Sequence, residues 1–244
     1  MENDLYKGTI EKLYKKADQL VGQVMEYIHE NDLLFIMSDH GFKPFKWGIN
    51  LNTWLHKEGY LIFKDTAARK DRKWFMDIDW KKSKAYAFGL AGIYINTKGR
   101  EKQGIISSGE EKRELAKEIK SKLESIYDEN NSIRPIRTAY LAEEIYQGPY
   151  IADAPDIFVG YEEGYRTSWN SAIGKVSDSV FEINKKPWSG DHCQDPAIVP
   201  GVLFSNWKSE EENPSIYDIA PTVLDIFGID KPDFQDGRIL KFHR

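Results

Sequence analysis

The sequence has a single cysteine, which excludes an intramolecular disulfide and gives no sign of a secreted protein. No apolar run approaches the ~20 residues that a transmembrane helix requires. The amino-terminal segment is charged and amphipathic and lacks a small-residue cleavage site, so it does not resemble a signal peptide. These absences leave the location in the cell open, and they predict a cytoplasmic protein if Met1 is the true start.

The chain also has little net charge, because 34 basic and 39 acidic residues nearly cancel to give −5. This balance gives no reason to expect a nucleic-acid partner. A length of 244 residues, with 41% hydrophobic and 30% charged residues, is ordinary for a globular protein with a substantial core. We therefore expect a single α/β domain over residues 1–244.

Residues 33–42 form the stretch around which the rest of the chain is organised. Five consecutive apolar residues, 33–37, lead into Ser38-Asp39-His40-Gly41. Such a run without alternation is typical of a strand covered on both faces in a parallel sheet, and ligands collect beyond the carboxyl ends of these strands. An acid beside an imidazole offers oxygen and nitrogen donors to a divalent metal. The same tripeptide is also compatible with a capped turn and a hydrogen-bonded histidine.

The order of the other elements predicts a mostly parallel sheet flanked by helices. Apolar residues spaced three or four apart predict an amphipathic helix over residues 5–29, packed over the strand that follows it. A second helix is expected to begin with Ser108 as its cap. The remaining predictions are a short helix ending at Gly59, an irregular connection at 65–82, a hairpin or two strands at 84–96, a strand and helical turn at 134–146, a strand at 154–160, a loop at 161–188 and a helix at 215–228.

A second acid–imidazole pair, Asp191-His192, follows Gly190 and precedes the apolar segment 197–204. The chain has only five histidines, so two such pairs beside glycine and apolar segments favour a metal site over two unrelated turns. Cys193 adjoins His192, but neighbouring residues of an extended chain point to opposite sides, and we do not expect a catalytic thiol.

Four segments, taken in order, resemble the alkaline phosphatase superfamily, and among its branches the type I phosphodiesterase/nucleotide pyrophosphatase group. These segments are Ser38-Asp39-His40-Gly41, Ala154-Pro155-Asp156, Ser189-Gly190-Asp191-His192 and the stretch SIYDIAPTVL at 215–224. The resemblance runs over nearly the whole chain, but it matches only the carboxyl-terminal portion of that fold. Within the second segment, Asp156 is expected to cap a turn rather than to line the site.

The resemblance implies a phosphoryl-transfer site with two divalent metal ions, zinc or alternatively manganese. Asp39 and His40 would bind one ion and His192 the other, while Asp191 would orient His192 from behind. Two ions ~4 Å apart can stabilise the attacking and leaving oxygens of a phosphoryl group together. The implied function is a metal-dependent hydrolase of phosphate mono- or diesters that acts on a small phosphate ester or a nucleotide.

The family's nucleophile, its neighbouring metal-binding Asp and an Asp-x-x-x-His pair belong to an earlier part of that fold. The nucleophile is therefore expected upstream of Met1, and the chain is expected to lack the amino-terminal part of the fold. An alternative is a noncatalytic or split-protein fragment that keeps the fold and associates with a missing half or with a second copy of itself. A cofactor-independent phosphoglycerate mutase is a third interpretation.

Overall fold

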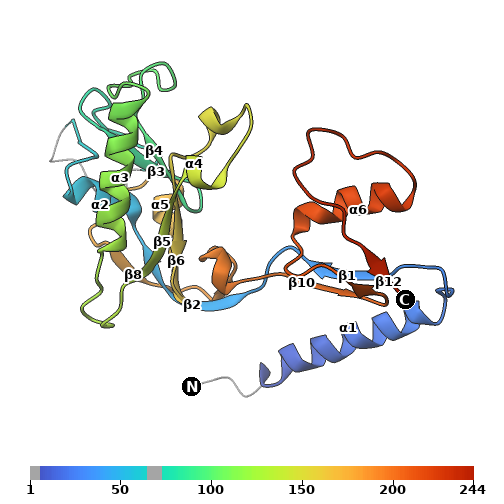
Figure 1. Ribbon diagram of the computed structural model, residues 1–244. Helices are drawn as coiled ribbons and strands as arrows, with labels where there is room; N and C mark the ends of the chain where they lie inside the picture. Colours follow the sequence, from blue (N-terminus) through green and yellow to red (C-terminus); the bar gives the residue numbers. More distant parts are fainter. Residues whose placement is uncertain (1–5, 65–72) are drawn as a thin grey trace. The chain divides into compact units, whose positions relative to one another are not determined.

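The computed structural model describes residues 6–64 and 73–244, which form two compact units (Figure 1). Unit 1 comprises residues 1–39 and 201–244, and unit 2 comprises residues 40–200. The single domain expected over residues 1–244 stays a prediction. Leu5 and the 65–72 part of the expected connection lie outside the described residues.

The larger sheet of unit 2 has four strands in the order β3-β4-β6-β5, and every pairing in it is antiparallel. Its strands are β3 (Ala85–Phe88), β4 (Gly92–Ile95), β5 (Ile136–Leu141) and β6 (Ile157–Tyr161). Helix α3 (Glu110–Glu124) packs against this sheet through Leu115, Ile119 and Leu123, which are buried at the helical spacing of three or four. The short helix α2 (Leu51–Lys57) adds an almost entirely buried first turn beside β3.

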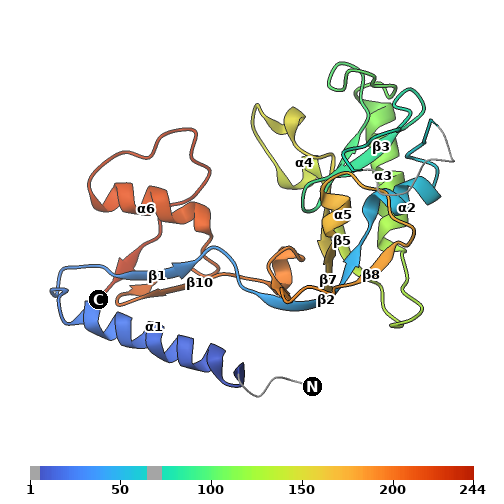
Figure 2. The same cartoon turned by 180° about the vertical axis from the view of Figure 1, so that it is seen from behind.

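The second sheet of unit 2 is built around β2 (Lys43–Ile49) (Figure 2). Strand β7 (Gly164–Thr167) pairs with β2 in parallel, whereas β8 (Phe181–Ile183) and β9 (Gly190–Asp191) pair with it antiparallel. Short helical segments complete the unit: α4 (Ala142–Ile145), α5 (Trp169–Ala172), and the 3-10 turns η2 (Ile151–Asp153) and η3 (Pro196–Ile198).

The expected mostly parallel sheet is wrong, because β2–β7 is the one parallel pairing between named strands in the described chain. Parallel neighbours need long crossover connections, whereas β3 and β4 are joined directly by a tight turn at Gly89 with φ 74°. The observed class is a mixed α/β fold with several small sheets.

Unit 1 contains helix α1 (Thr9–Met25) and two short antiparallel sheets. One pairs β1 (Phe35–Ser38) with β10 (Val202–Ser205), and the other pairs β11 (Lys208–Ser209) with β12 (Phe242–His243). A 3-10 turn, η4 (Ile216–Asp218), leads into α6 (Ile219–Ile226), which carries Pro221 in its first turn, where its missing N–H costs no hydrogen bond.

Two expectations for unit 1 are wrong. The strand at 33–37 is not covered on both faces, since β1 is only half-buried and Met37 is 49% exposed. Helix α1 has no buried residue along its whole length, so its apolar stripe does not pack on β1. Apolar periodicity thus predicted the helix correctly without predicting what covers it.

Several local predictions for unit 2 are confirmed: the helix ending at Gly59, the β3–β4 hairpin, the strand and turn of β5 and α4, and the strand β6. The Ser108 cap is wrong, because Gly109 takes the N-cap position of α3. The expected loop at 161–188 is also wrong, because it contains β7, α5 and β8.

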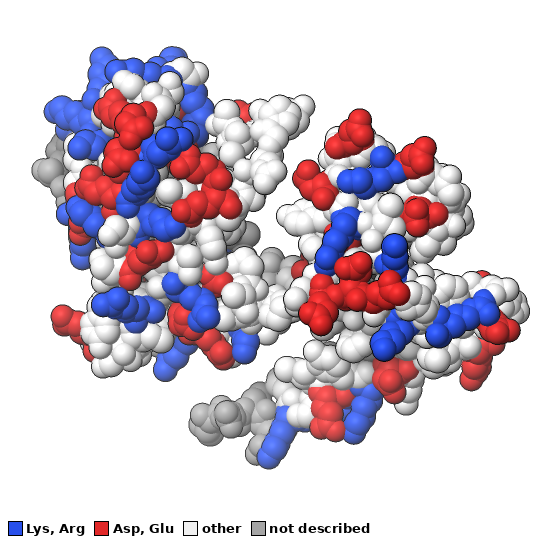
Figure 3. Space-filling view, viewed as in Figure 1, with Lys and Arg blue, Asp and Glu red and all other residues white. Residues whose placement is uncertain are grey.

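The solvent face of α3 alternates basic and acidic side chains (Figure 3). Lys117 pairs with Glu114 and Lys122 with Glu118 along the helix, and Lys120 reaches Glu144 of α4. Such exposed pairs contribute little to stability, because water and salt screen them. Among the helices of the described ranges, none has the length and apolar character needed to span a bilayer.

Candidate metal centre

The pairing of β9 with β2 brings two histidines of unit 2 together. His40 precedes β2, His192 follows β9, and Lys43 lies opposite Asp191 in the ladder. The two imidazole rings stack with centroids 3.9 Å apart and an interplanar angle of 12°. Phe42 lies against both rings, with centroid distances of 5.8 Å and 5.6 Å. Two histidines near the two ends of the unit 2 sequence therefore lie in contact with each other.

The hydrogen bond of His40 fixes which of its ring nitrogens can bind a ligand. Its Nδ1 lies 3.0 Å from the carbonyl oxygen of Gly41. A carbonyl oxygen only accepts, so Nδ1 donates this hydrogen bond, and Nε2 is the ring nitrogen that this bond does not use. In His192 the Nδ1 atom lies 3.5 Å from Oδ1 of Asp191, which likewise favours a proton on Nδ1. Both rings thus favour Nε2 as the ligand atom.

Each ring offers an imidazole nitrogen, and imidazole is a common ligand of zinc and other transition metals.

The segment 191–193 also contains three potential ligand atoms within 4.8 Å of one another, from Asp191, His192 and Cys193. Both oxygens of Asp191 are already engaged, however. Oδ1 accepts the backbone N–H groups of His192 at 2.7 Å and Cys193 at 3.1 Å, and Oδ2 accepts from Arg166. His192 is therefore the residue of this group with an open ligand atom.

The two chain neighbours of His192, Asp191 and Cys193, have pKa values shifted in opposite directions. Burial by itself raises the pKa of Asp191, but hydrogen bonds from Cys193 and the Arg166 guanidinium outweigh it and hold that pKa below its usual value. Burial and the adjacent Asp191 carboxylate raise the pKa of the Cys193 thiol to about 11. Asp191 is thus a stable carboxylate, and Cys193 is a protonated, poorly nucleophilic thiol near neutral pH.

The sequence model of the family named type I phosphodiesterase / nucleotide pyrophosphatase matches residues 4–186 of this chain. The chain belongs to this family. The family is part of the alkaline phosphatase superfamily, as the motif order predicted, and it indicates a hydrolase of the phosphodiesterase/nucleotide pyrophosphatase type. The match includes Asp39 and His40 and ends before Asp191 and His192. No curated protein and no solved structure matches the chain.

The Asp39-His40-Gly41 motif lies where the chain passes from one unit to the other. Asp39 is exposed and is the last residue of this part of unit 1, directly after β1. The N–H of Gly41 donates to the Val199 carbonyl at 2.9 Å, and a Cβ at Gly41 would lie 2.9 Å from the carbonyl oxygen of Pro200. Glycine follows His40 because the backbone passes too close to the segment 199–200 for a side chain.

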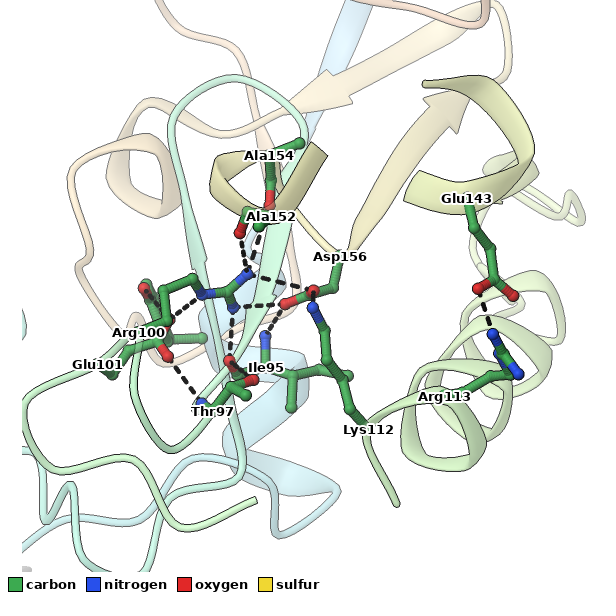
Figure 4. A network of polar contacts seen from close by, with 11 residues as sticks. Ile95, Thr97, Arg100, Glu101, Lys112, Arg113, Glu143, Ala152, Ala154 and Asp156 are labelled. Atoms are coloured by element: carbon green, nitrogen blue, oxygen red, sulfur yellow. Dashed lines mark hydrogen bonds and ion pairs between the residues drawn. The ribbon is translucent and has the colours of Figure 1, made fainter. Parts of the chain in front are cut away.

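The remaining motif acid of this chain, Asp156, has a structural role (Figure 4). Its buried carboxylate accepts the N–H of Ile95 at 2.6 Å and pairs with Arg100 at 2.6 Å and Lys112 at 2.5 Å. These contacts tie β4, the loop after it and α3 to the start of β6 (Figure 4). The prediction that Asp156 serves structure is confirmed, although it binds an ionic network rather than capping a turn.

Sequence reasoning missed Arg166, the largest fully buried side chain among the described residues. It lies on β7, inside the segment expected to be a loop, and its guanidinium bonds Asp191. The available signal was Tyr165-Arg166-Thr167, a strand-forming aromatic and β-branched pair around the arginine. Because arginine is rarely fully buried, its presence favoured the interpretation of this segment as a solvent-exposed loop.

Proposed function

We propose that this protein takes part in the metal-dependent hydrolysis of a phosphate mono- or diester. The phosphodiesterase/nucleotide pyrophosphatase family supports the reaction class, and the substrate class is a small phosphate ester or a nucleotide. The observation that carries the metal dependence is the stack of His40 and His192, with ring centroids 3.9 Å apart. We propose zinc, or alternatively manganese, as the ions.

Each residue has a defined part in this proposal. His40 holds its proton on Nδ1 against the Gly41 carbonyl and presents Nε2, with Asp39 as its carboxylate neighbour in the chain. His192 presents Nε2 to a second ion, and Asp191 orients it. When bound, two divalent ions would neutralise phosphoryl charge and stabilise the attacking and leaving oxygens.

The reaction breaks the bond between phosphorus and the leaving-group oxygen as a new oxygen–phosphorus bond forms, and the leaving oxygen takes up a proton. The proposal assigns the attacking oxygen to no residue of this chain. Cys193 does not fit that role, because its thiol is protonated near neutral pH and adjoins the Asp191 carboxylate.

Zinc binding tests the ligand assignment directly. Equilibrium dialysis of the purified chain should show tight zinc binding that falls on His192→Ala substitution, because the ring that holds one ion is lost. His29→Ala is a matched control, since His29 is an exposed histidine of unit 1. Equal zinc binding by the wild type and the His192→Ala variant would show that the ligand assignment is wrong.

Hydrolysis of bis(p-nitrophenyl) phosphate, an aryl phosphodiester, by a full-length form that supplies the attacking group tests the reaction class. Activity should disappear with a chelator, return with zinc, and fall by about 10-fold or more in the His192→Ala variant. Activity that survives exhaustive chelation would contradict a metal-dependent mechanism.

A second candidate function is a noncatalytic chain that associates with a partner or another copy. It is favoured by one observation in unit 1, the exposed apolar side chains of Met37, Val202 and Phe204 on the paired strands β1 and β10. Two-stranded ribbons with exposed apolar side chains are prone to pair with another chain. Light scattering should then show self-association that Phe204→Glu weakens, and a monomer at all concentrations would count against it.

A further inference from the structure

Arg166 is a buried charge whose single ionic partner among the described residues is Asp191. Its side chain is only 1% exposed, and its Nη1 donates to Oδ2 of Asp191. The guanidinium carbon lies 4.3 Å from the ring centre of Trp169 and 5.1 Å from that of Phe45. Within the described residues, its Nε has no hydrogen-bond partner. A guanidinium this deeply buried loses its hydration, so its carboxylate contact carries the compensation.

The partner of Arg166 controls the backbone that carries His192. Asp191 is 5% exposed, and its Oδ1 accepts two successive backbone N–H groups, those of His192 and Cys193. The carboxylate can hold this turn only in one orientation, in which Oδ2 faces Arg166. Removing the guanidinium would free the carboxylate to rotate, because no other cation of the described residues lies within ion-pair distance of Oδ2.

The two residues are placed by the same strand. Arg166 lies opposite Gly48 in the parallel β2–β7 ladder, and Asp191 lies opposite Lys43 in the antiparallel β2–β9 ladder. Strand β2 begins just after His40. The β2 strand therefore fixes the separation of the guanidinium, the carboxylate and both histidines within unit 2.

We propose that Arg166 is a positioning residue for His192, acting through Asp191. Arg166 fixes the orientation of the Asp191 carboxylate, which fixes the 191–193 turn and with it the His192 ring against His40. This inference rests on the proposed function only in one respect, which is the zinc affinity that is measured to test it. It assigns Arg166 no contact with substrate or metal.

The alternative is a purely structural role, in which the Arg166–Asp191 ion pair only stabilises unit 2. Unit 2 contains a matched control for that alternative in Arg100–Asp156, another arginine bound to a buried carboxylate. The pair Arg100–Asp156 supports β4 and β6 and has no link to the 191–193 turn. The variants Arg166→Lys and Arg100→Lys both keep the positive charge and both remove the planar fork of donors.

The experiment compares these two variants by two readouts, at a temperature where both are folded. The first is zinc affinity, which should fall by about 10-fold or more in Arg166→Lys and stay near wild type in Arg100→Lys. The second is the rate at which N-ethylmaleimide modifies Cys193, the one cysteine of the chain. This rate should rise in Arg166→Lys alone, because the freed 191–193 turn exposes the thiol.

The second readout separates failure of this inference from failure of the proposed function. If the wild type binds no zinc, the metal proposal fails, while a selective change in Cys193 reactivity still supports the positioning role. Equal effects of both variants, or unchanged Cys193 reactivity in Arg166→Lys, would overturn the inference. If Arg166→Lys does not fold, Asp191→Asn replaces it, since its amide oxygen can still accept both N–H groups while its amide nitrogen cannot accept from Arg166. The same two changes are expected of Asp191→Asn, and their absence overturns the inference.

Discussion

Single buried carboxylates hold several segments of this chain in place. Asp191 divides its oxygens between a backbone turn and Arg166, and Asp156 gathers a backbone N–H, Arg100 and Lys112. Buried acids of this kind are costly unless every lone pair is used, so their contacts identify the segments that they hold. In the first case that segment carries a candidate ligand, and in the second it carries part of the core sheet.

Cys193 offers a residue-level prediction about reactivity. Because burial and Asp191 raise its pKa to about 11, the thiol should react slowly with iodoacetamide at pH 7.5. The rate should climb as the pH rises toward that pKa, provided the fold persists. The urea-unfolded chain is the control, with a midpoint near the ordinary thiol pKa of about 8.5. A fast reaction of the folded chain at neutral pH would contradict the raised pKa.

Asp218 gives a pH-dependent prediction for unit 1. Burial raises its pKa, but N–H groups of Ser215 and Arg238 and the Arg238 side chain outweigh it and lower the pKa below the usual value. A lowered folded-state pKa means that the ionised form stabilises the fold above about pH 4, the pKa of an unfolded Asp. This contribution is lost as the pH falls through the folded-state pKa.

Replacement of Asp218 by Asn should therefore lower the free energy of unfolding at pH 7 by about 1–3 kcal/mol, because an acceptor of two backbone N–H groups loses one oxygen. The loss should shrink on acidification, as measured by urea denaturation at several pH values. A constant difference between wild type and variant across pH 2–7 would show that ionisation of Asp218 does not stabilise the fold.

At the scale of elements, local signals in the sequence predicted local structure. The stripe of Leu115, Ile119 and Leu123 marked α3, and Gly59 with φ 79° marked the end of α2. The prediction of a loop at 161–188 was wrong because the Gly, Ser and Asn residues of this segment indicate turns. Its strands form only by pairing with β2, which is distant in sequence. Strand formation there is a tertiary effect.

Two glycines in different elements test this distinction by substitution. A Cβ at Gly160 on β6 would overlap the buried carboxylate of Asp195, so Gly160→Ala should destabilise the chain by about 1–3 kcal/mol. Gly22 lies inside α1 with nothing near its missing Cβ, so Gly22→Ala should stabilise that helix by up to about 1 kcal/mol. Thermal unfolding of both variants, followed by circular dichroism, should give shifts of opposite sign. Shifts of the same sign would contradict one of the two assignments.

At the scale of the whole molecule, the order of motifs predicted the family but not the sheet topology. The motifs record residues that a site needs, whereas strand direction depends on which distant segments pair. The structure brings His40 and His192 together, but their function as ligands stays a prediction, as does that of Asp39. The burial of the Arg166 side chain could not be predicted, because it depends on contacts with Asp191 and with the rings of Phe45 and Trp169.

The location of the core gives a prediction for the whole chain. The main cluster of buried apolar side chains runs from Ile49 to Tyr165, entirely within unit 2. An excised segment 40–200 should therefore fold by itself and unfold cooperatively in urea, as followed by tryptophan fluorescence. A gradual, noncooperative transition would show that unit 2 depends on residues outside it.

The hydrogen bond from Gly41 to Val199 has a consequence for how such a chain can change over evolutionary time. The backbone enters and leaves unit 2 at neighbouring points, which is the arrangement of an inserted module. Loops within that module can lengthen, shorten or diverge while its entry and exit stay in register. A lineage could thus vary the loops of this module that lie outside β2, β7 and β9 and inherit the paired imidazoles at its entrance unchanged.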